Sequence, residues 1–131
     1  MPVVREGLTE SYRAIAPSVR LVRNSVCDCA AAAGIEGPKL DAVRLATSEA
    51  ATNSVVHAYR EQSGYVHVAA WVVGSEFWVL IADDGVGFNV QAKQPGLGLG
   101  LALITDACDE FTLLERAAGG TEARMCFYIK S

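Results

Sequence analysis

Apolar and polar residues recur with two different periods along the chain, and the first half carries the longer, helical one. Residues 8–15 are predicted to form a first strand. Helices are predicted over about 17–33 and about 37–59, each with a proline in its first turn. Gly34 follows the first of these helices at the position where glycine commonly ends one. The first half therefore reads as a strand followed by two helices.

The second half of the chain is dominated by strand-like patterns. Two apolar runs, separated by Gly74-Ser75-Glu76, predict a hairpin, and a third helix is expected to follow a glycine-dense segment and to end near Cys108. The predicted strands cover 65–73, 77–82, 111–115 and 121–130. Three helices and about five strands, mostly joined as hairpins, predict one α+β domain over residues 1–131. We expect a two-layer α/β sandwich whose mixed, mostly antiparallel sheet is covered on one face by three helices.

Composition and charge argue against a membrane protein, a secreted protein and a nucleic-acid-binding protein. The chain has no run of about 18 apolar residues and no apolar segment near its start, so we expect neither a membrane span nor a secretion signal, and we place the protein in the cytoplasm. Its net charge is −4 and its basic residues are dispersed, which argues against nucleic acid as a partner. The four cysteines are expected to be reduced thiols that behave as small hydrophobes.

The second predicted helix carries polar residues on a face that should not be polar. One stripe at steps of four, three, four and three contains Ala42, Ala46, Glu49, Asn53 and Val56, and we expect it to face the core. His57 continues this face one turn beyond Asn53. A buried carboxylate such as that of Glu49 needs a polar partner, because removing its charge from water costs several kcal/mol. The helix therefore predicts a polar site beneath it.

Two interpretations of this polar face stay open on the helix alone. Glu49 and Asn53 offer hard oxygen ligands, which suit Mg²⁺ bridged to phosphate better than they suit zinc. Alternatively, Glu49 takes part in a hydrogen-bond network with backbone groups at the edge of the core.

A carboxylate and two glycines follow the predicted strand over 77–82. Asp83 stands at the strand end, where it can accept a hydrogen bond from a purine amino group, and Gly85 and Gly87 would let a flat ring lie against the main chain. The same Asp-Gly pattern also occurs in plain turns, so this motif by itself leaves both interpretations open.

A second glycine motif precedes the third predicted helix. Gly96, Gly98 and Gly100 alternate with leucines, and the free N–H groups at a helix start favour an anion such as phosphate. The spacing differs from that of a dinucleotide-binding fingerprint, and the phosphate-loop pattern GxxxxGK[ST] is missing. Alternating glycine could equally serve close packing of helices.

Taken in order, four segments resemble the N-box and G-boxes of the histidine-kinase-like ATPase superfamily, which includes gyrase, sensor histidine kinases and mismatch-repair ATPases. The segments are SEAATNSVVHAYR (48–60), DDGVGF (83–88), PGLGLGLALI (95–104) and GGT (119–121). Within that superfamily the chain is most similar to bacterial anti-sigma factor serine kinases, and the helix opening Ser18-Val19-Arg20-Leu21-Val22-Arg23 shares this likeness.

The resemblance implies an ATP site with Mg²⁺. By it, Glu49 would polarise or deprotonate the attacking nucleophile, Asn53 would hold Mg²⁺ between the phosphates, and Asp83 would bind the adenine amino group. Gly85 and Gly87 would shape the adenine side, and Gly96, Gly98 and Gly100 the phosphate side. Thr121 would assist Asp83 through its hydroxyl and a shared water, and His57 would make either a phosphate-side contact or a helix-to-loop hydrogen bond.

The resemblance also implies partners. An anti-sigma factor of this kind sequesters a sigma factor, phosphorylates an anti-anti-sigma (STAS-type) protein on serine and can form a homodimer. Arg20 and Arg23, beside Val19 and Val22, are our candidates for part of a partner surface, with a plain solvated face as the alternative. Only eight residues, with Lys93 as their one cation, separate Gly87 from Gly96, where the superfamily usually has a longer ATP lid. This short lid predicts a second function, a nucleotide-dependent binding module with little or no kinase activity.

Overall fold

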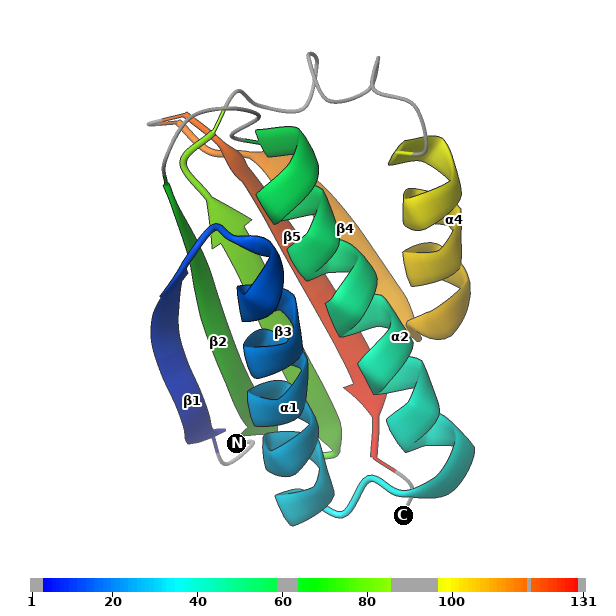
Figure 1. The fold of residues 1–131 in the computed structure, drawn as a ribbon. Coiled ribbons are helices and arrows are strands. Elements are labelled where there is room, and N and C mark those ends of the chain that lie inside the picture. The colour runs from blue at the N-terminus through cyan, green and yellow to red at the C-terminus, as the bar shows by residue number, and fades with distance from the viewer. Residues whose placement is uncertain (1–3, 59–63, 86–96, 118, 130–131) are drawn as a thin grey trace.

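The computed structural model describes residues 4–58, 64–85, 97–117 and 119–129, and they form two layers. A five-stranded sheet makes one layer, and all of its helical cover lies on one face (Figure 1). In chain order the elements are β1 (Val4–Arg13), α1 (Ala16–Ala32), α2 (Gly37–Asn53), a π-helix (Ser54–Ala58), β2 (Tyr65–Val73), β3 (Glu76–Asp83), α4 (Leu97–Ala107), β4 (Glu110–Glu115) and β5 (Thr121–Tyr128).

The sheet has the order β1-β2-β3-β5-β4, and each of its four pairings is antiparallel. The predicted two-layer α+β architecture is confirmed, although the described strands form a wholly antiparallel sheet where a mixed one was expected. The last strand, β5, inserts between β3 and β4, so the end of β3 lies next to the start of β5. This crossover positions the candidate site, because it brings Asp83 beside the turn that precedes Thr121.

Several element boundaries differ from those predicted. The first strand covers Val4–Arg13, four residues earlier at its start than the pattern indicated. The hairpin loop holds only Gly74 and Ser75, since Val73 pairs with Glu76; Gly74 has a φ of +59°, which suits the tight turns that match the twist of paired strands. The second helix is α-helical only to Asn53, and Ser54–Ala58 then widens into a π-helix, a rare form that is frequent at functional sites.

The hydrophobic core lies between the helices and one face of the sheet. Every second residue of β2 and β3 is buried there, which is the alternation expected of strands covered on one side. The largest fully buried apolar side chains are Phe77, Phe127, Ile81, Ile104, Met125, Val22, Val26, Val43, Val66, Val68 and Val79. Among the described residues no helix is long and apolar enough to cross a membrane.

The buried face of α2 is rotated from the predicted stripe. Val43, Ala46, Ala50 and Ala51 are buried, whereas Val56 is 54% exposed, and so the prediction that Val56 faces the core is wrong. Because α2 packs against the sheet and against both neighbouring helices, its buried surface is broader than one stripe. Glu49 and Asn53 are half-buried at the edge of this surface, on the side of α4.

The middle of α2 contains a buried hydroxyl that gives a stability prediction. Thr47 is fully buried, and its Oγ1 has no hydrogen-bond partner among the described residues. Thr47→Val keeps the β-branched shape and removes the unpaired hydroxyl, so we expect the free energy of unfolding to rise by about 1 kcal/mol in urea denaturation. Thr52→Val is the matched control, because Thr52 Oγ1 donates to the Ser48 carbonyl at 2.7 Å. An equal gain in both variants would contradict this account of Thr47.

Candidate nucleotide-binding site

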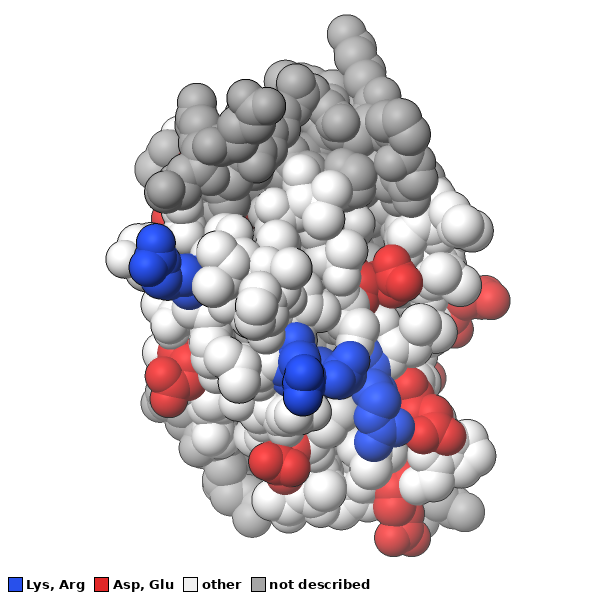
Figure 2. Space-filling view, viewed as in Figure 1, with Lys and Arg blue, Asp and Glu red and all other residues white. Residues whose placement is uncertain are grey.

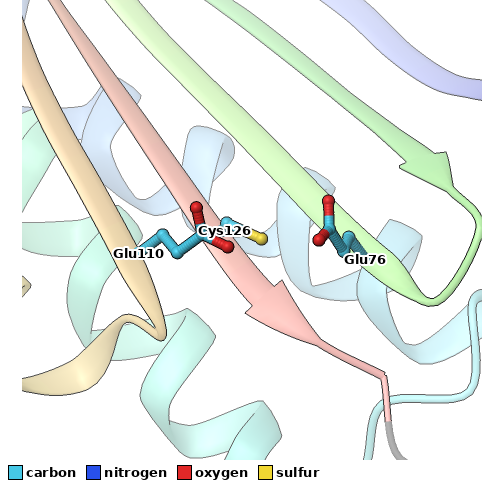
Figure 3. A group of neighbouring side chains, drawn as sticks. All are labelled: Glu76, Glu110 and Cys126. Atoms are coloured by element: carbon cyan, nitrogen blue, oxygen red, sulfur yellow. The ribbon is translucent and has the colours of Figure 1, made fainter.

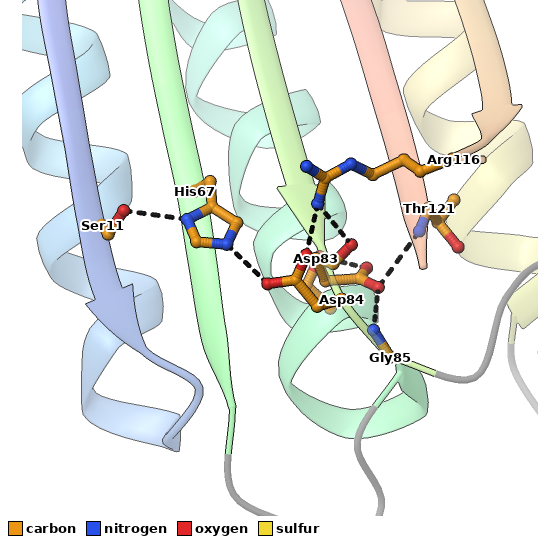
Figure 4. A network of polar contacts seen from close by, with 8 residues as sticks. Ser11, His67, Asp83, Asp84, Gly85, Arg116 and Thr121 are labelled. Atoms are coloured by element: carbon orange, nitrogen blue, oxygen red, sulfur yellow. Dashed lines mark hydrogen bonds and ion pairs between the residues drawn. The ribbon is translucent and has the colours of Figure 1, made fainter. Parts of the chain in front are cut away.

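Asp83 ends β3 with its carboxylate turned toward the helices. The residue is 2% exposed. Its Oδ1 accepts hydrogen bonds from the backbone N–H of Gly85 at 3.0 Å and of Thr121 at 3.2 Å (Figure 4). Its Oδ2 accepts a hydrogen bond from Ser54 Oγ at 3.2 Å. Three donors from three segments thus fix the orientation of one buried carboxylate.

The two neighbouring aspartates have opposite electrostatic environments. Burial raises the pKa of Asp83 above its ordinary value of 3.8, and the hydrogen bonds from Gly85, Thr121 and Ser54 offset only part of this effect. The hydrogen bond with His67 is the largest cause that lowers the pKa of Asp84, and Arg116 adds to it. Asp84 is a solvated ion-pair partner, whereas Asp83 is a desolvated acceptor, and a desolvated acceptor is the more selective group for a ligand N–H.

A pocket lies against the Asp83 carboxylate, between the helices and the sheet. Its polar lining comes from Asn53, Ser54, Asp83 and Thr121. Its apolar lining consists of Ala50, Ile81, Leu101, Ile104, Phe111, Leu113 and Ala123. An apolar pocket with a few convergent polar groups is typical of ligand sites, and with a volume of about 20 Å³ this one admits a water-sized group beside Asp83.

The first turns of α4 approach α2 at Glu49 and Asn53. A Cβ added at Gly100 would lie 3.2 Å from Glu49 Oε2 and 3.4 Å from Asn53 Oδ1. Glycine at this position therefore lets the α4 backbone lie directly against these two side chains. The glycine motif has two interpretations, an anion site or a device for close helix packing. Close packing is what Gly100 shows, and the contact lies beside Glu49 and Asn53.

Gly100→Ala should separate stability from activity. Alanine favours the helix by up to about 1 kcal/mol, but its methyl group must displace the flexible end of Glu49. We expect the free energy of unfolding to change by less than about 1 kcal/mol, while phosphate transfer, the activity that the resemblance implies, should fall about tenfold because Glu49 would be misplaced. The control is Leu99→Ala, since Leu99 is 68% exposed on the same helix. A transfer rate unchanged by Gly100→Ala would argue against a role for this contact.

The sequence matches a known family over almost its whole length. Residues 13–127 match the model of the histidine kinase-like ATPase domain. The chain belongs to this family. The four ordered motifs that suggested the superfamily all lie within the matched residues.

Curated relatives of this histidine kinase-like ATPase domain carry two kinds of name. The anti-sigma F factor of Thermoanaerobacter sp. (strain X514) is 26% identical over 100 residues, which cover 68% of this chain and 70% of the relative. The serine-protein kinase RsbW of Staphylococcus epidermidis is 29% identical over 134 residues, covering 89% and 83%. The RsbW of Bacillus licheniformis is 33% identical over 81 residues, covering 61% and 51%. The resemblance to anti-sigma factor serine kinases is confirmed.

A solved structure shares the fold. The crystal structure of the RsbU and RsbW domains of a Mycobacterium tuberculosis protein matches with a TM-score of 0.71 and 25% sequence identity. The match covers 92% of this chain and 32% of the other, so this domain spans about a third of that chain.

Of the other predicted site residues of the ATPase domain, some contact Asp83 and others lie outside the described residues. Gly85 and Thr121 lie against Asp83, and each donates its backbone N–H to the carboxylate. The hydroxyl role that the resemblance implies for Thr121 stays a prediction. His57 lies in the π-helix, but its side chain is not among the described ones, and Gly98 lies in the first turn of α4. Gly87, Gly96 and Lys93 lie outside the described residues.

Sequence reasoning missed two residues that touch Asp83. Ser54 lies four positions after the buried Ala50, so its place on the buried face of the helix was a usable signal. Arg116 donates from Nη1 to the backbone carbonyl of Asp83 at 2.9 Å, and no local pattern marks it.

The helix-covered face of the molecule carries charges of both signs. Basic side chains gather near its middle with acidic ones around them (Figure 2). On α1, Arg20 is exposed and Arg23 half-buried, but Val22 is fully buried, so the expectation that Val22 accompanies them on the surface is wrong. Leu21, 54% exposed, takes that place beside Arg20.

A second group of ligand-type side chains lies far from the pocket, on the uncovered side of the sheet. Glu76, Glu110 and Cys126 offer atoms within 4.8 Å of one another (Figure 3). Glu76 accepts a hydrogen bond from Trp78 Nε1 at 3.0 Å, and Glu110 accepts one from the Tyr128 hydroxyl at 2.8 Å. Burial, with the nearby carboxylates, raises the pKa of Cys126 to about 12. These contacts account for the group, and all four cysteines are free thiols.

Proposed function

We propose that this chain is a cytoplasmic ATP-binding anti-sigma factor with protein serine kinase activity, formed by residues 1–131 as a single domain. The observation that carries the proposal is the buried, three-fold hydrogen-bonded Asp83 carboxylate at the wall of an apolar pocket. Membership of the ATPase family and the names of the relatives support it.

The adenine side of the proposed site is built around Asp83. Because the pocket itself admits only a water-sized group, we place the ring at its mouth, with the amino group donating to the Asp83 carboxylate. The fixed donors from Ser54, Gly85 and Thr121 hold that carboxylate in place, so little reorganisation accompanies binding. Gly85 and Gly87 keep the main chain free of side chains beside the ring.

The phosphate side of the proposed site lies where α2 meets α4. Asn53 would hold Mg²⁺, whose preference for hard oxygen ligands fits the amide and carboxylate oxygens present there. Bound Mg²⁺ would neutralise phosphate charge. Glu49 polarises or deprotonates the serine hydroxyl of the acceptor, and the N–H groups around Gly96, Gly98 and Gly100 bind phosphate oxygens. Phosphoryl transfer suits such a site because it depends chiefly on positioning and charge stabilisation.

The proposed protein partners are a sigma factor, which the chain sequesters, and an anti-anti-sigma protein of the STAS type, which it phosphorylates. We place part of the partner surface on α1, at Arg20, Leu21 and Arg23, where positive charge adjoins an exposed apolar side chain. The proposal includes self-association as a homodimer, which light scattering on the purified chain measures.

The test is transfer of labelled phosphate. Incubation of the purified chain with ATP, Mg²⁺ and anti-anti-sigma proteins from the same genome should produce phosphoserine on one of them. Affinity capture with the chain as bait should recover a sigma factor. Absence of transfer to every candidate, with ATP binding intact, would remove the kinase part of the proposal.

The eight-residue connection between Gly87 and Gly96 favours a second function, a protein-binding switch that ATP sets without phosphate transfer. A short connection with one cation offers little to cover a triphosphate. In this case the affinity for a sigma factor should differ between ATP, ADP and the nucleotide-free chain. Identical affinities in the three states would exclude the switch.

A further inference from the structure

A chain of polar contacts on the uncovered side of the sheet holds the end of β3, which carries Asp83. Arg116 Nη1 donates to the Asp83 carbonyl at 2.9 Å and to Asp84 Oδ1 at 2.7 Å (Figure 4). His67 Nε2 donates to Asp84 Oδ2 at 2.7 Å, and His67 Nδ1 lies 2.8 Å from Ser11 Oγ in a further hydrogen bond. One arginine nitrogen thus joins the peptide group of Asp83 to the side chain of the next residue.

The turn that supplies Arg116 is itself fixed against Asp83. The Arg116 N–H donates to the Gly120 carbonyl at 3.0 Å, and the Gly119 N–H donates to the Arg116 carbonyl at 2.9 Å. Gly120 has a φ of +92°, and a Cβ there would collide with the Asp83 carbonyl oxygen. The β4–β5 turn therefore packs backbone to backbone on the end of β3, with Arg116 as its side-chain contact.

These contacts bear on the direction of the Asp83 carboxylate. Asp83 is the last residue of β3, so sheet hydrogen bonds hold the chain before Asp83 but not the chain after it. The direction of its Cα–Cβ bond follows the orientation of its peptide group, and Arg116 holds the carbonyl of that group. A rotation there would move the carboxylate relative to Ser54 and to the pocket.

We propose that Arg116 is a positioning residue that sets the preference of this site for adenine, with Asp84 as its anchor. The inference rests on the proposed ATP-binding function. Arg116 lies on the side of the sheet away from the helix-side pocket and acts through Asp83. When the Asp83 carboxylate points toward the ring, it accepts a hydrogen bond from the adenine amino group. Guanine has a carbonyl oxygen in the same place, which the carboxylate repels.

The experiment measures the affinities of the full chain for ATP and for GTP, each with Mg²⁺, by calorimetry. Arg116→Met should weaken ATP binding about tenfold and leave the weak binding of GTP within about twofold, so that the ATP-to-GTP preference falls. The matched control is Arg124→Met, because Arg124 lies on the adjoining strand β5 and, like Arg116, pairs with an acid, in this case Glu122. Arg116→Lys, which keeps one charged donor nitrogen, should recover part of the lost preference.

A double variant separates positioning from general structural damage. If Arg116 acts through Asp83, then Arg116→Met should change ATP affinity by less than about twofold when Asp83→Asn is already present. If wild type binds ATP and the Arg116→Met and Arg124→Met variants bind it with equal affinity, the positioning role is wrong but the proposed function stands. A full further tenfold loss in the double variant would also overturn the positioning role. Wild type that binds neither nucleotide would overturn the proposed function and this role together.

Discussion

Asp83→Asn is expected to lower the affinity for ATP about 100-fold or more while the chain stays folded. The variant keeps the shape of the side chain but replaces one charged acceptor oxygen with an N–H₂ group. In the pocket this group would face the adenine amino group, donor against donor, without water to relieve the mismatch. A lost charge-assisted hydrogen bond and a buried unpaired donor together amount to about 3 kcal/mol, which is more than 100-fold in affinity.

The fold should tolerate this change because each contact of Asp83 has a counterpart in asparagine. The amide oxygen can accept from Gly85 and Thr121, and the amide nitrogen can donate to the Ser54 hydroxyl. Burial raises the pKa of Asp83, so the ionised form costs folding free energy, and the stability from this group is lost as the pH rises through that pKa. A neutral asparagine avoids this cost.

Two measurements check the Asp83 prediction. Calorimetry with ATP and Mg²⁺ compares the affinities, and urea denaturation at pH 7 should show Asp83→Asn at least as stable as wild type. Asp41→Asn serves as the control, because Asp41 is exposed on α2, pairs with Arg44 on the surface and does not line the pocket. Undiminished ATP binding by a folded Asp83→Asn would remove the adenine role.

Glu49→Gln is expected to lower the rate of phosphate transfer about 100- to 1000-fold and to leave ATP affinity within about threefold. Glu49 lies beside Asn53 and Gly100 and outside the lining of the pocket next to Asp83, so its charge bears on the reacting group more than on adenine. Glutamine fits the same space but neither deprotonates nor strongly polarises a serine hydroxyl.

The matched control for Glu49 is Asp41→Asn on the same helix. Asp41 forms an exposed ion pair with Arg44 at 2.8 Å, and such surface pairs contribute little. This variant should transfer phosphate at the wild-type rate. Equal rates in Glu49→Gln and wild type would show that Glu49 is not the catalytic group, whereas no transfer by wild type would favour the binding switch.

The fold was largely predictable because its patterns are strong and local. The apolar runs of β2 and β3, the alternation over β5 and the prolines that begin α1 and α2 mark these elements without tertiary information. The buried face of α2 was harder to predict. Alanines occur on several of its sides, so its pattern does not distinguish a helix that packs on one surface from one that packs on three. The π-helix at Ser54 likewise has no local signal.

For the site, the sequence alone determined which chemical groups are available and in what order. It placed Asp83 at a strand end before Gly85, and Glu49 and Asn53 one turn apart on a helix. Only the tertiary structure decided which residues contact these groups. Ser54, Arg116 and Thr121 contact Asp83 from 29, 33 and 38 positions away. They meet because β5 inserts between β3 and β4 and α2 crosses the same sheet, and strand order of this kind depends on how whole faces pack.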